Sequence, residues 1–401
     1  MPKISTDKNK IEEFLSRGSV DLIVKENLHQ RLLGGKQLRI KHGIDPTGPK
    51  IHLGRASTMR KLARFQELGH KIVLIVGDFT AQIGDASDKD QERKMLDAKQ
   101  VKKNLKDYLK QMALIFDVKA AEVHYNSEWL GKLNYFDICR QANVFSVAQM
   151  LDRENFSKRF KAGERISLRE FLYPLMQGYD SVAIRADIEI GGSDQLFNML
   201  AGRELQRFYK QPPQDVVTYK LLDGTDGRKM STSWGNVILI TDSPDEIFGK
   251  LMSMKDEVML QYFELATDVP LREIRQIENM LKANSVNPRD VKLRLASEIV
   301  AIYCGKEKAK KAQANFTKVF QEKEMPEEIK IFSSNEMVIN PISALFVSGL
   351  SASKGEARRI TEQGGFSLDG KVIKDPNYKI KLDKPRIIKK GKREFRKIIK
   401  K

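Results

Sequence analysis

Cysteine is scarce in this chain of 401 residues, and long apolar runs are missing. The two cysteines, Cys139 and Cys304, lie far apart without metal-ligand spacing, which argues against a disulfide framework and indicates a reducing compartment. We expect both to be packing residues. No run of about 18 apolar residues occurs, so no membrane association is expected. The first residues lack the apolar core of a signal peptide, which predicts a cytoplasmic protein or a processed organelle protein.

Acidic residues are outnumbered. The chain has 53 Asp and Glu against 71 Lys and Arg, a formal net charge of +18. This excess predicts a polyanionic partner, with charge that merely maintains solubility as the alternative. Ten Lys and Arg against one acidic residue, Glu394, lie within residues 384–401. The length predicts two or three domains.

The first half of the chain has an α/β pattern. Amphipathic helices are expected at residues 11–15, after a Ser5 or Thr6 cap, and at residues 22–33. An apolar segment at residues 38–44 then predicts a buried strand, and residues 56–68 predict a helix. The apolar run 72–76 predicts a second buried strand, so strand, helix and strand form a right-handed βαβ unit of a parallel sheet.

The turn between the first strand and its helix, residues 43–55, is rich in glycine and proline. Unpaired N–H groups at such a helix start favour an anion such as a triphosphate, and Thr47 and His52 add side-chain donors. The spacing matches neither a Walker loop nor a dinucleotide fingerprint, so a plain βα turn is the alternative. Ligands of parallel sheets bind at this carboxyl end of the strands.

A second helix carries polar residues in a pattern suited to a small ligand. Ser167-Leu168-Arg169-Glu170 is a capping box, which predicts a helix starting at about Leu168. Tyr173, Gln177 and Asp180 then fall on one face at i, i+4 and i+7. A phenol, an amide and a carboxylate suit a ligand with an ammonium and a hydroxyl group, although spacing alone equally permits a solvent-facing stripe.

Two short motifs carry a family resemblance. His52-Leu53-Gly54-Arg55 resembles the HIGH signature of class I aminoacyl-tRNA synthetases, and Lys229-Met230-Ser231-Thr232-Ser233 resembles their KMSKS signature. Their order and separation fit as well. Asp45-Pro46-Thr47, Gly191-Gly192-Ser193-Asp194-Gln195 and residues 173–180 narrow the resemblance to the bacterial tyrosyl-tRNA synthetases. It covers almost the whole chain.

The resemblance implies an α/β architecture in three parts. Residues 1–222 are expected to form a Rossmann-like parallel-sheet catalytic domain, in which a helical insertion between residues 93 and 161 forms a homodimer interface. Residues 223–330 would contain the KMSKS-type loop and an α-helical anticodon-region domain; helical periodicity itself extends over residues 244–323. Residues 331–401 would form a linker and a small α+β RNA-binding domain of the alpha-L type with a basic tail.

The resemblance also implies the reaction. Tyrosine would be activated with ATP to tyrosyl-adenylate and diphosphate, and the tyrosyl group would then pass to tRNA(Tyr). Positioning and charge stabilisation carry this chemistry, which agrees with the lack of a Ser-His-Asp or metal-ligand pattern. ATP would bring its own Mg²⁺, and no protein-bound metal or prosthetic group is expected. The implied partners are tyrosine, ATP, tRNA(Tyr) and a second copy of the chain.

Site residues follow from matched positions. The matched catalytic residues are Thr47, His52, Arg55, Lys89, Arg93, Lys229 and Thr232. The matched tyrosine-binding residues are Asp85, Tyr173, Gln177, Asp180 and Gln195. The matched ATP-binding residues are Gly43, Asp45, Gly54, Gly192, Asp194, Lys229 and Met230. The matched RNA-binding residues are Lys354, Arg358 and Arg359, on one expected helix face.

Four positions depart from the family pattern. Arg55 replaces the second His of HIGH but keeps a donor with a fixed charge. Thr232 replaces the second Lys of KMSKS and loses a charge that Arg228 or Lys229 is placed to supply. Asp88 replaces a glycine that the family has in the polar loop at residues 84–93, after the second predicted strand. Lys41 stands where many members have a Tyr that contacts the substrate phenol.

These departures leave two alternatives open. One is a catalytically weak paralogue with an RNA-binding or regulatory role, which the joint presence of the substrate-facing residues disfavours. The other is a tryptophanyl-type synthetase, which Asp180 disfavours because a carboxylate suits a hydroxyl group better than an indole.

Overall fold

The structure is a computed structural model. It describes residues 4–85, 87, 95–231, 234–321, 329–391 and 394–400. The chain divides into two compact units, Met1–Lys310 and Lys311–Lys401, which are described separately.

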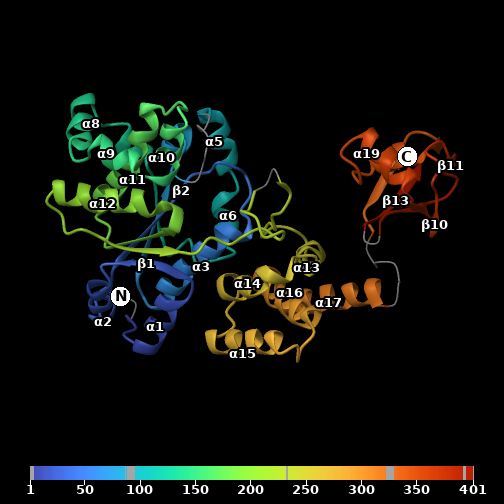
Figure 1. Cartoon of the computed structure of the whole chain (residues 1–401), viewed down its shortest axis with the longest axis horizontal. Helices are drawn as coiled ribbons and strands as arrows, with labels where there is room; N and C mark the ends of the chain where they lie inside the picture. The colour runs from blue at the N-terminus through green and yellow to red at the C-terminus, as the bar shows by residue number, and fades with distance from the viewer. Residues whose placement is uncertain are drawn as a thin grey trace. The chain divides into compact units, whose positions relative to one another are not determined.

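A six-stranded sheet forms the centre of the first unit (Figure 1). Its order is β1-β6-β5-β2-β3-β4, with β2 to β6 parallel and β1 antiparallel to β6. The strands are β1 (Ser19–Ile23), β2 (Arg39–Ile44), β3 (Lys71–Val76), β4 (Glu122–Tyr125), β5 (Ile188–Gly192) and β6 (Asp215–Tyr219). The strand order reverses between β2 and β5, and such a switch point is where open parallel sheets bind ligands. The predicted Rossmann-like parallel sheet is confirmed.

Helix α3 (Leu53–Glu67) connects β2 to β3, as the βαβ pattern predicts. Its residues Met59, Leu62 and Phe65 are buried. The helix begins three residues before the expected start, because His52 has extended backbone and occupies the N-cap. Gly54 and Arg55 therefore lie in the first helical turn, at the positive end of the helix dipole.

Three local predictions are corrected, two of them by strand pairing and one by a local helix cap. Residues 19–23, partly assigned to a helix, form β1 because they pair with β6, and α2 spans only Lys25–Leu33. Strand β4 interrupts the stretch between residues 93 and 161 that was expected to be helical, because it pairs with β3. Helix α1 (Lys8–Ser16) is capped by Asp7 instead of Ser5 or Thr6, since the Asp7 carboxylate accepts from Asn9 N at 3.0 Å.

Helices α11 and α12 lie on one side of the sheet and α1 and α2 on the other (Figure 1). Helix α11 (Leu168–Ile184) starts where the capping box predicts, with Ser167 N donating to Glu170 Oε2 at 2.9 Å. Gly178 allows α12 (Leu196–Phe208) to approach closely, because a Cβ atom there would lie 3.1 Å from Gly202 N. The other helices between β3 and α11 are α4 (Thr80–Ile83), α5 (Ala98–Leu105), α6 (Tyr108–Met112), α7 (Ser127–Leu130), α8 (Tyr135–Ala142), α9 (Val147–Leu151) and α10 (Glu154–Lys161).

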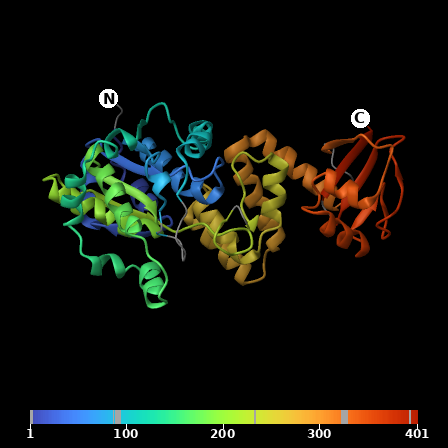
Figure 2. The same cartoon turned by 90° about the horizontal axis from the view of Figure 1, so that it is seen from above.

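A helical bundle completes the first unit (Figure 2). It contains α13 (Pro244–Met252), α14 (Met259–Ala266), α15 (Leu271–Lys282) and α16 (Pro288–Cys304), and α17 (Lys306–Gln321) follows. Arg17 joins the bundle to the sheet-containing part, because its guanidinium donates to Glu264 O at 3.1 Å and to Thr267 O at 3.3 Å. No helix among the described residues is long and apolar enough to cross a membrane.

The second unit is a small α+β module. Helices α18 (Pro341–Val347) and α19 (Lys354–Glu362) accompany a sheet of order β10-β9-β12-β13-β7 and the pair β11-β8. Its strands are β7 (Ile331–Ser334), β8 (Val338–Ile339), β9 (Phe366–Leu368), β10 (Lys371–Val372), β11 (Ile380–Lys381), β12 (Arg386–Lys390) and β13 (Glu394–Lys400). Leu345, Phe366 and Ile388 belong to its core. The basic segment expected as a tail supplies the antiparallel pair β12–β13.

Candidate active site

A cavity of about 490 Å³ opens at the carboxyl ends of β2 and β5. It is lined by every described residue that was matched to catalysis, tyrosine or ATP: Gly43, Asp45, Thr47, His52, Gly54, Arg55, Asp85, Tyr173, Gln177, Asp180, Gly192, Asp194, Gln195, Lys229 and Met230. Lys89, Arg93, Thr232 and the departure at Asp88 lie outside the described residues. The matched residues therefore converge on one site from segments far apart in the sequence.

The start of α3 forms one end of this cavity. Burial, together with the charge of Arg55, lowers the pKa of His52 to about 4, so its imidazole is neutral at pH 7. Its Nδ1 atom is buried and has no hydrogen-bond partner among the described residues. A neutral imidazole at the positive end of the α3 dipole offers a hydrogen-bonding group to a phosphate without adding a second fixed charge to that of Arg55.

Arg55 is held in place by two hydroxyl groups. Its Nη2 atom donates to Thr47 Oγ1 at 2.6 Å, and its Nη1 atom donates to the phenol of Tyr108. The guanidinium thus has a fixed direction at the rim of the cavity, where a second histidine was the family pattern.

The two signature motifs touch each other. Gly54 N donates to Met230 Sδ at 3.3 Å, and a Cβ atom on Gly54 would lie 2.9 Å from that sulfur. The chain beyond the second motif pairs with the segment before α3, since Leu53 N donates to Ile238 O at 2.9 Å. The absence of a side chain at Gly54 therefore permits the loop that contains Lys229 and Met230 to lie against the helix start.

Asn236 shapes this loop, and the sequence analysis missed it. Its Oδ1 accepts from Ser231 N at 2.8 Å, while its Nδ2 donates to Lys229 O at 3.0 Å and Asp226 Oδ1 at 2.9 Å. Asn236 is buried. A lone asparagine five residues after Ser231 gives no sequence signal of this role.

A network of hydrogen bonds surrounds the Asp85 carboxylate. Its Oδ1 accepts from Ser87 N at 2.9 Å, and its Oδ2 accepts from Gln195 Nε2 at 2.7 Å. Asn198, fully buried on α12, donates to Gln195 Oε1 and Gln177 Oε1, each at 3.1 Å. Sequence reasoning missed Asn198, although its position three residues after Gln195 places both on one helix face.

Tyr173 is fixed at the end of β2. Its hydroxyl donates to Asp45 Oδ2 at 2.8 Å, and Thr80 Oγ1 donates to Asp45 Oδ1 at 2.7 Å. Burial, with the nearby Asp45 carboxylate, raises the pKa of Tyr173 well above its usual range, so the phenol stays neutral. Asp45, expected at the nucleotide, thus also orients a residue expected at the amino acid.

Asp180 lies deep in the cavity. Its Oδ1 accepts from Trp129 Nε1 at 2.8 Å, and its Oδ2 accepts from Asn126 Nδ2 at 3.4 Å. Burial raises the pKa of Asp180 to about 7, although these donors and the Lys41 ammonium oppose the shift. Asn126 directly follows β4, but a helix was expected there, so the strand-end rule could not have selected it. Trp129 carried no sequence signal either.

Two further predictions concern residues that do not line the cavity. Lys354, Arg358 and Arg359 are exposed on α19 of the second unit, where Arg358 Nη1 lies 3.8 Å from Glu362 Oε1. The expectation of two packing cysteines is wrong for Cys139, which is exposed on α8.

The class of the protein follows from the family comparison. The model for class I tRNA synthetases (W and Y) matches residues 34–321, well over half of the chain, and the S4 domain model matches residues 344–384. The chain therefore belongs to the class I tRNA synthetases, which use ATP.

Individual relatives narrow this class. The tyrosine–tRNA ligase of Thermotoga maritima is 46% identical over 96% of both chains. That of Dehalococcoides mccartyi is 46% identical over 99% of this chain and 100% of its own. Within its class, the chain belongs to the tyrosine–tRNA ligases, a family that binds tyrosine, ATP and tRNA. This result sets aside both the tryptophanyl alternative and the inactive paralogue.

Solved structures agree on the fold. The tyrosyl-tRNA synthetase of Archaeoglobus fulgidus, solved with L-tyrosine, has a TM-score of 0.62 at 22% identity and covers 77% of this chain and 100% of its own. A truncated mitochondrial enzyme of Aspergillus nidulans has a TM-score of 0.63 at 21% identity and covers 78% of this chain and 94% of its own.

Proposed function

We propose that the cavity binds tyrosine at its Asp180 end and ATP at its α3 end, and joins them as tyrosyl-adenylate. The observation that carries this assignment is that two kinds of group line one cavity. Asp85 and Gln177 share the donor Asn198 and, with Asp180, supply carboxylate and amide oxygens. Arg55 and Lys229 supply positive charge, and the loop that contains Lys229 contacts the start of α3. The first set suits an ammonium and a hydroxyl group, and the second suits phosphates.

Each group at the tyrosine end has a proposed role. The Asp180 carboxylate accepts from the substrate phenol, and Trp129 and Asn126 hold that carboxylate in place. The α-ammonium lies among acceptor atoms of Asp85, Tyr173 and Gln177. The hydroxyl of Tyr173 already donates to Asp45, so its oxygen remains available as an acceptor.

The reaction needs no protein nucleophile. An oxygen of the tyrosine carboxylate attacks the α-phosphorus of ATP, and the bond to the diphosphate breaks. Negative charge grows on the departing diphosphate, where Lys229 and the α3 N–H groups stabilise it. Lys89, Arg93 and Thr232 remain predicted members of this set. A terminal ribose hydroxyl of tRNA(Tyr) then attacks the carbonyl carbon and releases AMP. Mg²⁺ would arrive bound to ATP.

Amino-acid-dependent exchange of labelled diphosphate into ATP tests the assignment. Tyrosine alone among the standard amino acids should support rapid exchange, because only its hydroxyl pairs with Asp180 at the proposed depth. Exchange driven by tryptophan, or by no amino acid, would refute the assignment. A Tyr173→Phe variant, which keeps the ring but loses the hydroxyl, should raise KM for tyrosine and leave KM for ATP within about twofold.

The exposed apolar residues on α8 and its neighbours support a homodimer. Tyr135 is 82% exposed and Phe136 71% exposed, and Val147, Phe160 and Leu168 are exposed nearby in the chain. Large apolar side chains at such exposure favour burial against a partner, here a second copy. Sedimentation equilibrium should give a dimer for the natural chain and a monomer for Phe136→Glu. A natural chain that sediments as a monomer would contradict this proposal.

The second unit is proposed to bind the tRNA backbone. Lys354, Arg358 and Arg359 are exposed on one short helix, and the β12–β13 pair adds further Lys and Arg. Such contacts would make tRNA binding strongly dependent on salt. We place the enzyme in cytoplasmic translation.

A further inference from the structure

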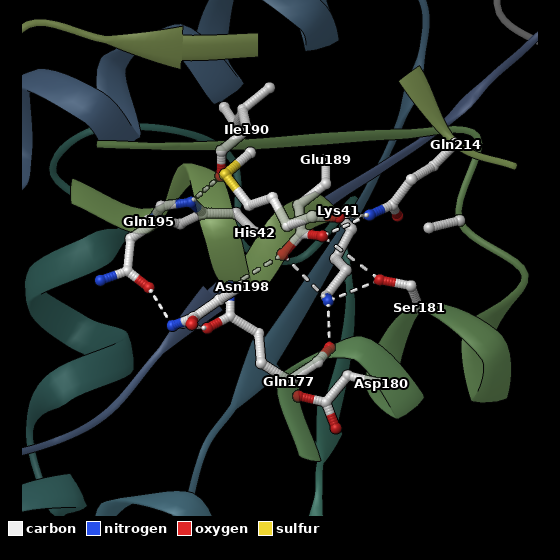
Figure 3. Close-up of polar contacts among 12 residues, drawn as sticks. Lys41, His42, Gln177, Asp180, Ser181, Glu189, Ile190, Gln195, Asn198 and Gln214 are labelled. Carbon is white, nitrogen blue, oxygen red and sulfur yellow. Dashed lines mark hydrogen bonds and ion pairs between the residues drawn. The ribbon is translucent and has the colours of Figure 1, made fainter. Parts of the chain in front are cut away.

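Lys41 is a buried lysine beneath the proposed tyrosine pocket. It lies on β2 and is 0% exposed. Its ammonium donates to Gln177 O at 2.7 Å and to Ser181 Oγ at 2.7 Å, and it lies 3.0 Å from Glu189 Oε1 (Figure 3). A lysine ammonium has three N–H groups, and these three contacts use all of them. Lys41 therefore has no donor left for a substrate phenol.

Glu189, on the neighbouring strand β5, is the acidic partner of Lys41. It is 1% exposed, and its carboxylate also accepts from Gln214 Nε2, from Ser181 Oγ at 3.3 Å and from Gln177 Nε2 at 3.1 Å. Each of these groups donates to the carboxylate, so Glu189 acts only as an acceptor here. The pair thus places a fixed acceptor beside the side-chain amide of Gln177.

The orientation of the Gln177 amide follows from this fixed acceptor. With its Nε2 on Glu189, its Oε1 accepts from Asn198 (Figure 3), and Gln177 lines the cavity. A flipped amide would set Oε1 against the carboxylate, acceptor against acceptor, and would present an NH₂ group to the cavity. With a neutral glutamine in place of Glu189, both orientations of the Gln177 amide become accessible. The flipped orientation presents its NH₂ group to the cavity and repels an ammonium.

We propose that Lys41 and Glu189 form a positioning pair that holds the Gln177 carbonyl oxygen toward the cavity and thereby sets the affinity for the α-ammonium of tyrosine. Lys41 pairs with Glu189 and also donates to the Gln177 backbone, so it acts on both ends of the same residue. The inference rests on the proposed function of this pocket. It also gives Lys41 a role different from that of the tyrosine found at this position in many family members.

A simpler explanation is that the ion pair only stabilises the fold. Breaking a buried pair by removing one partner is strongly destabilising, whereas replacing both partners by neutral groups is often tolerated. The two explanations diverge for Lys41→Met/Glu189→Gln, which leaves no unpaired charge. Pure stabilisation predicts that this double variant recovers tyrosine affinity, whereas positioning predicts that it does not, because a neutral glutamine can both donate and accept.

The matched control is a second buried ion pair, which joins α10 to α11, the helix that carries Gln177. Arg159 Nη1 lies 2.7 Å from Glu170 Oε1, and their side chains are 2% and 1% exposed. Neither residue lines the cavity. Arg159→Met/Glu170→Gln therefore removes an equally buried charge pair between α10 and α11 without changing a residue in contact with Gln177.

The experiment measures KM for tyrosine and for ATP in diphosphate exchange, with Tm recorded for each variant. Glu189→Gln and the Lys41/Glu189 double variant should raise KM for tyrosine about tenfold and leave KM for ATP within about twofold. The Arg159/Glu170 double variant should lower Tm and leave both KM values within about twofold. Should the double variant at Lys41 fail to fold, Glu189→Gln alone, which is nearly isosteric, carries the test.

A ligand without the ammonium sharpens the test. Competitive inhibition by 3-(4-hydroxyphenyl)propionate should be equal, within about twofold, in the natural chain and in Glu189→Gln. Glu189→Gln should also add little to a Gln177→Ala variant, because the residue it positions is gone. Unchanged KM for tyrosine in Glu189→Gln, or equal weakening of both ligands, would overturn the inference. Failure of the natural chain to use tyrosine would instead overturn the proposed function.

Discussion

Asp180→Asn isolates the charge at the deep end of the pocket. Trp129 Nε1 can only donate, so the asparagine oxygen should keep the 2.8 Å bond to Trp129. The NH₂ group then takes the place of Oδ2 and faces Asn126 and the substrate. Tyrosine loses a hydrogen bond to a charged acceptor, worth about 1.5–3 kcal/mol, and kcat/KM should fall about 10-fold to 150-fold.

Phenylalanine provides the internal control for this variant. It has no hydroxyl to lose, so its kcat/KM should not fall, and the ratio of the two substrates should narrow by the same 10-fold to 150-fold factor. Diphosphate exchange with each amino acid at saturating ATP measures the ratio. A ratio that stays within twofold of the natural value would refute the position assigned to Asp180.

The pH dependence has a definite sign. Because burial raises the pKa of Asp180 from 3.8 to about 7, part of the free enzyme is protonated below pH 7. The kcat/KM for tyrosine should therefore fall as pH drops below about 7, while Asp180→Asn should show no such limb. The free energy of unfolding has the opposite pH dependence. The raised pKa of Asp180 stabilises the folded state most at low pH, and this stabilisation is lost as pH rises through about 7.

Four further changes test other parts of the chain. Gly54→Ala should cut adenylate formation about tenfold with little change in Tm, because the new Cβ displaces the Met230 side chain from the start of α3; an unchanged single-turnover rate would contradict this role of the contact. Lys229→Ala should slow adenylate formation at least about a hundredfold, as expected for a lost cation at the leaving diphosphate, whereas Thr232→Lys should change it by less than about tenfold. A nearly inert natural chain that Thr232→Lys restores would contradict this expectation. A chain ending at Lys330 should keep diphosphate exchange and lose tRNA charging, and equal charging by both lengths would remove the RNA-binding role of the second unit.

The sequence by itself determined the features that depend on local order. The apolar run of β3 predicted that strand because a strand buried on both faces needs nearly continuous apolar residues. The positions of Tyr173, Gln177 and Asp180 on one face followed from helix geometry alone, once the capping box located the start of α11. The HIGH-like and KMSKS-like motifs are contiguous, so their resemblance needed no fold.

Only the tertiary structure decided which distant groups meet. Strand β1 and strand β4 exist because of their pairing with β6 and β3, which outweighs weak local preferences. The sequence contained Lys41 and Glu189 but gave no sign that they touch, since their contact depends on β2 and β5 being neighbours in the sheet. Burial, which converts such a contact into a fixed charge beside Gln177 and raises the pKa of Asp180, is a property of the packed chain and has no local pattern in the sequence.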